Sequence, residues 1–225
     1  MKRNILSLSI ITVLSLTVAC KDKIKEAETA DAVIANESTP AVTYNVDTKE
    51  SVIDWTGTKL GGKHIGTIHL SNGKIGVTEG VVSSGEFTID INSIVVTDLT
   101  DKTGKADLEN HLKGSIEGEE DHFFNVNKYP KGTFEITSVN TEEDMTTYVE
   151  GNLTLKDITK SIKYYLKFPA TVTVSDNNVS IVSAPFAINR TLWNINYASK
   201  SVFSDLGDKF VNDDIELAIN IKASK

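Results

Sequence analysis

The stretch Ile215–Ala223, "IELAINIKA", decides the fold class of this chain. Two sets of residues alternate in it: Ile215, Leu217, Ile219 and Ile221 against Glu216, Ala218, Asn220 and Lys222. Successive side chains of a β-strand point to opposite faces of the sheet. The stretch therefore predicts a strand with one apolar face and one polar, solvent-exposed face, as is typical of antiparallel sheets.

The same alternation recurs upstream in "GEFTIDINSI" (85–94), "GTFEITSV" (132–139) and "IKYYLKF" (162–168). Turn residues separate such segments, and Asn72-Gly73 and Asn177-Asn178 each predict a hairpin. Short amphipathic strands at this spacing favour an all-β sandwich or closed barrel. Composition does not choose between the two.

One region departs from the strand pattern. In Asp101–Lys113, Leu108 and Leu112 stand four residues apart among charges, and Gly114 follows as a C-terminal cap. This predicts a short helix over one end of the sheet. The connection continues to Pro130, and long connections in compact domains are often functional lids.

The N-terminal part predicts export. Residues 1–19 have a basic start and an apolar run, as in a signal peptide, and Cys20, the only cysteine, follows "LTVA" as in a lipoprotein cleavage site. Lipid on Cys20 would anchor the protein to a membrane of the cell envelope, facing the periplasm or the cell surface. Residues 20–42 are polar and predict a flexible tether, which leaves 43–225 as the folded domain.

Charge and motifs argue against several function classes. The 225 residues carry a formal net charge of −8, which disfavours nucleic acid as a partner. The four histidines do not form an obvious metal site. His64 and His69 are five residues apart, so their side chains should lie on opposite faces of a strand. Gly114 and Gly118 interrupt any helix that would present both His111 and His122. We therefore expect no metal site and no cofactor. The sequence also lacks the common hydrolase and phosphate-binding motifs, so we expect no catalytic residues.

Arg190 is the exception on the apolar face. In "PFAINRTLW" it continues the parity of Phe186 and Ile188 and should point inward, where an unpaired charge is costly. It must lie at the rim, pair with an acid or meet the polar head of a ligand. The interior itself is either packed with side chains or hollow enough for one small ligand.

Seven segments, in order, resemble the YceI-like family. They are "YNVDTKESVIDWTGTK", "GGKHIGTIHLSNGKI", "FTIDINSIVVTDL", "ENHLKG", "DHFFNVNKYPKGTFEITSV", "VEGNLTLKDITKSI" and "FAINRTLWNINYAS", between Tyr44 and the end of the chain. The resemblance implies an antiparallel lipocalin-like β-barrel of about eight strands with a helix and loop lid. It further implies an apolar tunnel for a polyisoprenoid or related amphiphile, and it leaves pairing of two barrels into a homodimer open.

The resemblance and the strand parity together nominate residues for ligand binding. They are Trp55, Phe87, Ile89, Ile91, His111, Phe123, Phe124, Phe134, Leu153, Leu155, Arg190 and Trp193. In this hypothesis Arg190 orients the head of the ligand, and the protein is a non-catalytic, membrane-anchored lipid binder or carrier. Two alternatives stay open: a packed barrel that serves as a stress-response or interaction module, and an enzyme on lipid or quinone-like substrates that uses Asp54, His111 or His122.

Overall fold

The computed structural model describes residues 24–35, 40–143, 146–166 and 172–225. The expected signal peptide, Cys20 and Phe168 lie outside these ranges. Among the described residues, no helix has the length and apolar character needed to cross a bilayer.

Strands dominate the described part of the chain, where thirteen of them form one sheet. They are β1 (Lys25–Glu26), β2 (Glu28–Asp31), β3 (Val42–Val46), β4 (Val52–Lys59), β5 (Gly62–Thr78), β6 (Val81–Val96), β7 (Lys131–Thr141), β8 (Thr147–Leu155), β9 (Ile158–Tyr165), β10 (Val172–Val174), β11 (Asn178–Val182), β12 (Phe186–Asn189) and β13 (Val211–Ser224). The helical segments are η1 (Asp101–Thr103), α1 (Lys105–Lys113) and η2 (Arg190–Trp193).

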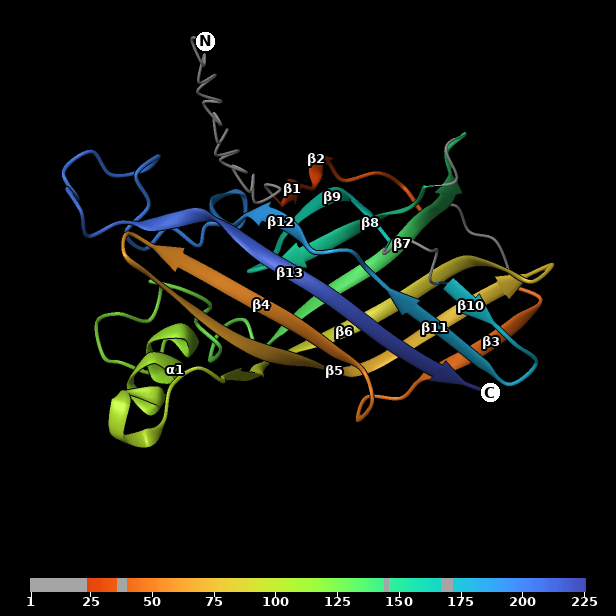
Figure 1. Ribbon diagram of the computed structural model, residues 1–225, viewed down its shortest axis with the longest axis horizontal. Helices are drawn as coiled ribbons and strands as arrows, with labels where there is room; N and C mark the ends of the chain where they lie inside the picture. The colour runs from red at the N-terminus through yellow and green to blue at the C-terminus, as the bar shows by residue number, and fades with distance from the viewer. Residues whose placement is uncertain (1–23, 36–39, 144–145, 167–171) are drawn as a thin grey trace, which may run out of the picture.

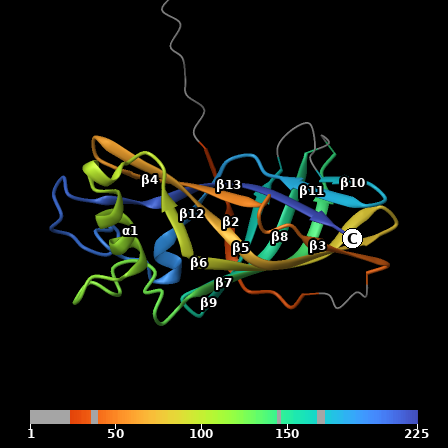
Figure 2. The ribbon, with the colours of Figure 1, turned by 90° about the horizontal axis from the view of Figure 1, so that it is seen from below.

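The sheet curls into a barrel. Strands β4 to β9 pair consecutively and antiparallel, and β13 pairs with β4 on one side and with β11 and β12 on the other. Figures 1 and 2 show the barrel lengthwise, with α1 at one end and β10, β11 and the C-terminus at the other. The predicted all-β barrel is confirmed. The count of about eight is too low, because the sheet has thirteen strands and several of them, such as β1, β2 and β10, are only two to four residues long.

The barrel has a seam between β9 and β12, and the N-terminal segment lies along it. β2 pairs antiparallel with β9, and β1 pairs parallel with β12. Between them, Ala27 is buried and its N–H donates to the carbonyl of Ala187 at 2.7 Å. The flexible tether predicted for residues 20–42 is therefore wrong for 25–31, because both seam edges offer unpaired backbone groups that this segment satisfies.

One predicted hairpin is also wrong. Strand β5 continues through Asn72 and Gly73, which pair with Thr88 and Phe87 of β6. A Cβ on Gly73 would lie 2.7 Å from the Val46 side chain and 3.0 Å from the Phe87 ring. The glycine thus permits close packing rather than a turn. At the second site the hairpin does form, since β10 and β11 pair on either side of residues 175–177.

The expected helix and strand faces are observed. Helix α1 ends at Gly114, whose φ of 70° is left-handed and whose N–H donates to the carbonyls of Asn110 and His111. On β6, Phe87, Ile89 and Ile91 are buried. This strand thus turns one apolar face to the interior, where the candidate site lies.

Candidate ligand-binding cavity

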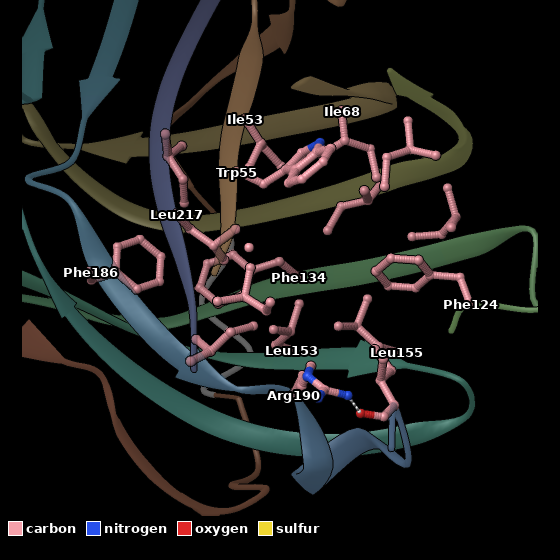
Figure 3. A pocket seen from close by; sticks show the side chains of 18 of the residues that line it. Ile53, Trp55, Ile68, Phe124, Phe134, Leu153, Leu155, Phe186, Arg190 and Leu217 are labelled. Atoms are coloured by element: carbon pink, nitrogen blue, oxygen red, sulfur yellow. Dashed lines mark hydrogen bonds between the residues drawn. The ribbon is translucent and has the colours of Figure 1, made fainter. Parts of the chain in front are cut away.

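The barrel is hollow. Its interior contains a cavity of about 220 Å³. Inward side chains of β4 to β9 and of β11 to β13 form the wall, and Leu108, Leu112, Phe123 and Phe124 contribute from the α1 end. Figure 3 shows the labelled side chains of Ile53 and Trp55 from β4, Phe134 from β7 and Leu217 from β13 converging on the same space.

Ten of the twelve nominated residues line this cavity. They are Trp55, Phe87, Ile89, Ile91, Phe123, Phe124, Phe134, Leu153, Leu155 and Arg190. The wall does not include His111 or Trp193. Trp193 is fully buried and its indole N–H donates to the carbonyl of Leu153 at 3.1 Å, so it fastens η2 to β8 behind the wall.

Much of the cavity wall consists of residues that the sequence did not single out. Apolar residues that also line the cavity include Ile53, Ile68, Leu70, Ile94, Ile136, Ile162, Ile181, Phe186, Ile188, Ile215, Leu217, Ile219 and Ile221. Apart from Ile94, which follows a change of phase in β6, these residues occupy the apolar parity of their strands, and that parity was the signal available to find them.

Aromatic rings cross the barrel interior in a row. Phe87 lies 6.3 Å from Phe134, Phe134 lies 6.0 Å from Tyr164, and Tyr164 stacks on Phe186 at 4.6 Å between centroids. Burial raises the pKa of the Tyr164 hydroxyl, so it is neutral at physiological pH. The row presents flat apolar surface and a single phenol to whatever fills the space.

Arg190 points inward as predicted, but its guanidinium is already engaged. Its N–H groups donate to four backbone carbonyls, those of Ile195, Tyr197, Val211 and Asn212. The carboxylate of Asp213 lies 3.7 Å away. Burial lowers the pKa of Arg190 and Asp213 partly offsets this. Because four of its five donors are used, the predicted role of Arg190 in orienting a ligand head does not fit the structure.

The cavity reaches the surface near the β4–β5 hairpin. Its lining there includes the exposed Lys59 and the half-buried Thr58 and His64. The His64 Nδ1 lies 2.9 Å from the carboxylate of Asp98, which also accepts the N–H of Ile65 at 3.0 Å. Burial opposes the charge on Asp98, but these hydrogen bonds outweigh it and lower its pKa. A polar rim therefore surrounds an apolar interior.

A family model for the YceI-like domain matches residues 44–223. The chain belongs to the YceI-like family. Among solved structures, the chain is similar to Burkholderia cenocepacia BcnA, with 16% identity, a TM-score of 0.59, and coverage of 79% of this chain and 99% of that one. It is also similar to a polyisoprenoid binding domain from Saccharophagus degradans, with 14% identity, a TM-score of 0.53, and coverage of 80% and 97%. No curated protein sequence matches this chain.

The lid of this YceI-like domain consists of residues 101–130. The N–H groups of Phe124 and Val126 donate to the carbonyls of Leu112 and Lys113, so the loop returns along the end of α1. The ammonium of Lys156 donates to the carbonyl of Phe123 at 2.9 Å. Burial lowers the pKa of Lys156, and Asp121 partly offsets this. These contacts hold Phe123 against the cavity.

The same return of the chain brings His111 and His122 together. His111 Nε2 lies 2.8 Å from His122 Nδ1, and the carboxylate of Glu119 lies 3.5 Å and 3.8 Å from these two nitrogens. Burial is the main cause that lowers the pKa of His111. Helix α1 does end at Gly114, as expected, but the loop that follows carries His122 back to the helix, which the spacing of the two histidines did not predict. The i,i+3 spacing of Glu119 and His122 was the available signal.

Proposed function

We propose that this protein binds an apolar lipid of the isoprenoid or acyl class inside its barrel. The observation that carries the proposal is the hollow interior, whose wall is built from the apolar faces of nine strands. At about 220 Å³ it exceeds the roughly 150 Å³ apolar cavity that stays dry and binds benzene.

Energetics support a ligand in this space. Unfilled cavity volume costs about 24 cal/mol per Å³, so an empty cavity of this size costs roughly 5 kcal/mol of stability. Burying each methylene of a lipid chain contributes about 0.8 kcal/mol. A chain of several carbons would therefore offset the loss without any hydrogen bond.

The family relationship supports the same ligand class. The structural neighbour from Saccharophagus degradans is described as a polyisoprenoid binding domain, and its fold is similar to that of this chain. We infer a polyisoprenoid, an isoprenoid quinone or a fatty acid as the class of ligand, since all are long and apolar with a small polar end.

We further propose a location for the protein. The signal-like residues 1–19 and Cys20 support export and lipidation, which would hold the barrel at a membrane of the cell envelope. A binder in that place takes its ligand from the bilayer or delivers it there.

We propose that the protein binds its ligand and does not catalyse a reaction on it. Of the residues considered for an acid-base role, Asp54 is exposed, and none of Asp54, His111 and His122 is among the described residues that line the cavity. A fully packed interaction module is disfavoured by the unfilled interior.

Gly57 offers a sharp test. It lines the cavity near its opening, and the nearest atom to an added Cβ would be Ile215 Cδ1 at 3.8 Å, so a side chain has room to grow inward. We expect the full-length chain purified from a bacterial host to carry lipid in native mass spectra, or to take up geranylgeraniol or palmitic acid. In Gly57→Phe the ring should fill this space, and bound lipid should fall while the barrel stays folded.

The matched control is Thr56→Phe, at the residue of β4 that precedes Gly57 and lies outside the cavity wall. It should bind lipid like the original chain. A bare protein mass after incubation with both lipids would overturn the proposal, and so would undiminished binding by Gly57→Phe.

A further inference from the structure

The backbone conformation of the lid brings His111 and His122 together. The N–H of His122 donates to the carbonyl of Glu119 at 3.0 Å, which puts both side chains on one side of a turn. The left-handed Gly114 directs that turn back toward His111. The ring of Tyr197 lies 4.6 Å from the ring of His111 and 4.5 Å from that of His122 and covers both.

We propose that His111, Glu119 and His122 form a binding site for a divalent transition-metal ion, with Zn²⁺ the best-fitting ion. The donor atoms are His111 Nε2, His122 Nδ1 and a carboxylate oxygen of Glu119, and they all lie within 4.8 Å of one another. Two imidazoles and one carboxylate form a ligand set that zinc takes in proteins, with a fourth position left for water. This site is separate from the lipid cavity and does not depend on the function proposed for it.

The distances fit an ion with a small adjustment. Zinc binds nitrogen and oxygen at about 2.0–2.1 Å, so tetrahedral donors lie about 3.4 Å apart. The carboxylate oxygen Oε2 of Glu119 lies 3.5 Å from His111 Nε2 and 3.8 Å from His122 Nδ1. The two imidazole nitrogens, at 2.8 Å, need to separate by about half an ångström to reach the tetrahedral value. That motion is within the reach of side-chain rotation.

Charge and exposure also suit a metal. The side chains of His111, His122 and Glu119 are 19%, 36% and 42% exposed, so the site is reachable from solvent while partly shielded. The sequence "EGEED" just before His122 adds negative charge that attracts cations. Burial is the largest cause that lowers the pKa of His111.

A bound ion would connect two parts of the lid. His111 belongs to α1, whereas His122 precedes Phe123 and Phe124, which line the cavity. A metal shared by both would fix the phenylalanines in place and stabilise the closed lid by mass action. The site thus offers a way for metal supply to alter the rigidity of the lid.

The first measurement is a zinc titration followed by NMR. The full-length chain, purified in mild detergent through a tag without histidine and freed of metal by a chelator, contains four histidines. One equivalent of Zn²⁺ should shift the ring C–H signals of His111 and His122 and leave those of His64 and His69 in place. Co²⁺ in the same position should give the absorption of a four- or five-coordinate ion.

Variants complete the test. His111→Gln and His122→Gln should each weaken zinc binding by about 100-fold or more, since even the loss of an outer partner costs 10–100-fold. The matched control is His64→Gln, at an imidazole that has one carboxylate partner, Asp98, and it should bind zinc normally. Glu119→Gln, on a surface side chain, should weaken binding without a folding defect, as circular dichroism of the metal-free variants would check.

Two results would contradict the proposed metal site. One is the absence of shifts at His111 and His122 with one equivalent of zinc. The other is retention of stoichiometric zinc in both histidine variants, which would place the ion elsewhere.

Discussion

The N-terminal strap (residues 25–33) and the lid (residues 101–130) complete the same barrel by different means. The strap lies along the side, over the seam between β9 and β12, whereas the lid lies over one end (Figure 1). The strap is held mainly through backbone hydrogen bonds, and Ala27 is its buried apolar contact among the described residues. The lid also has backbone hydrogen bonds, but in addition four of its side chains form part of the cavity wall.

This difference separates stability from ligand binding. A strand on an open edge satisfies N–H and C=O groups that would otherwise invite aggregation, but it does not line the cavity. The lid contacts whatever occupies the cavity through Phe123 and Phe124. Damage to the lid should therefore lower both stability and lipid affinity, and damage to the strap should lower stability alone.

The largest effect is expected at Gly114. A Cβ there would lie 2.3 Å from the carbonyl oxygen of Glu120, and the φ of 70° is itself unfavourable for alanine. Gly114→Ala should cost about 3 kcal/mol of unfolding free energy, from the backbone strain and the displacement of the loop. Urea denaturation would measure the loss, and lipid affinity should fall with it.

Gly118→Ala is the control. Gly118 also has a positive φ, 82°, but an added Cβ meets nothing within 4 Å. Only the conformational cost remains, about 1 kcal/mol. Equal losses at Gly114 and Gly118 would show that the lid does not depend on the close contact at Gly114.

The sequence predicted the lid better than the strap, because the lid helix depends on residues close together in the sequence and the strap depends on pairing with residues far along the chain. The Leu108 and Leu112 spacing and the capping Gly114 are local, and the helix follows from them. The strap sequence "ETAD" carries no strand pattern of its own. Its partner residues, such as Lys163 opposite Glu28, lie far along the chain, so pairing depends on tertiary structure.

The candidate sites follow the same division. Strand parity and the family resemblance together identified ten residues of the cavity wall, and parity could contribute because inward direction is a local property of a strand. Arg190 was correctly directed inward, but its four carbonyl acceptors come from loops and from β13. The contact between His111 and His122 depends on the path of the loop after Gly114, which spacing alone does not encode.

A smaller effect is expected from a variant that damages the strap alone. Asn152 is buried on β8; its Oδ1 accepts from the N–H of Val33 at 3.1 Å and its Nδ2 donates to the carbonyl of Val33 at 2.7 Å. Asn152→Ala should cost about 1.5 kcal/mol through loss of both bonds. Lipid affinity should stay unchanged, as native mass spectra would measure.

Asn140→Ala provides the matched comparison. Asn140 is exposed and donates to the Ser138 hydroxyl, so its loss should stay within about 0.5 kcal/mol. A fall in lipid affinity in Asn152→Ala would break the separation between strap and cavity.

The smallest effect is expected at the ion pair between strap and barrel. Lys160 Nζ lies 3.0 Å from the carboxylate of Asp31, whose side chain is 97% exposed, so water and salt screen the attraction. Asp31→Asn should therefore cost less than about 0.5 kcal/mol at low ionic strength and nothing measurable at high salt. The backbone pairing of Asp31 with Lys160 does not require the charge and should persist. A salt-sensitive loss as large as that of Asn152→Ala would mean that charge, rather than backbone pairing, holds the strap to the seam.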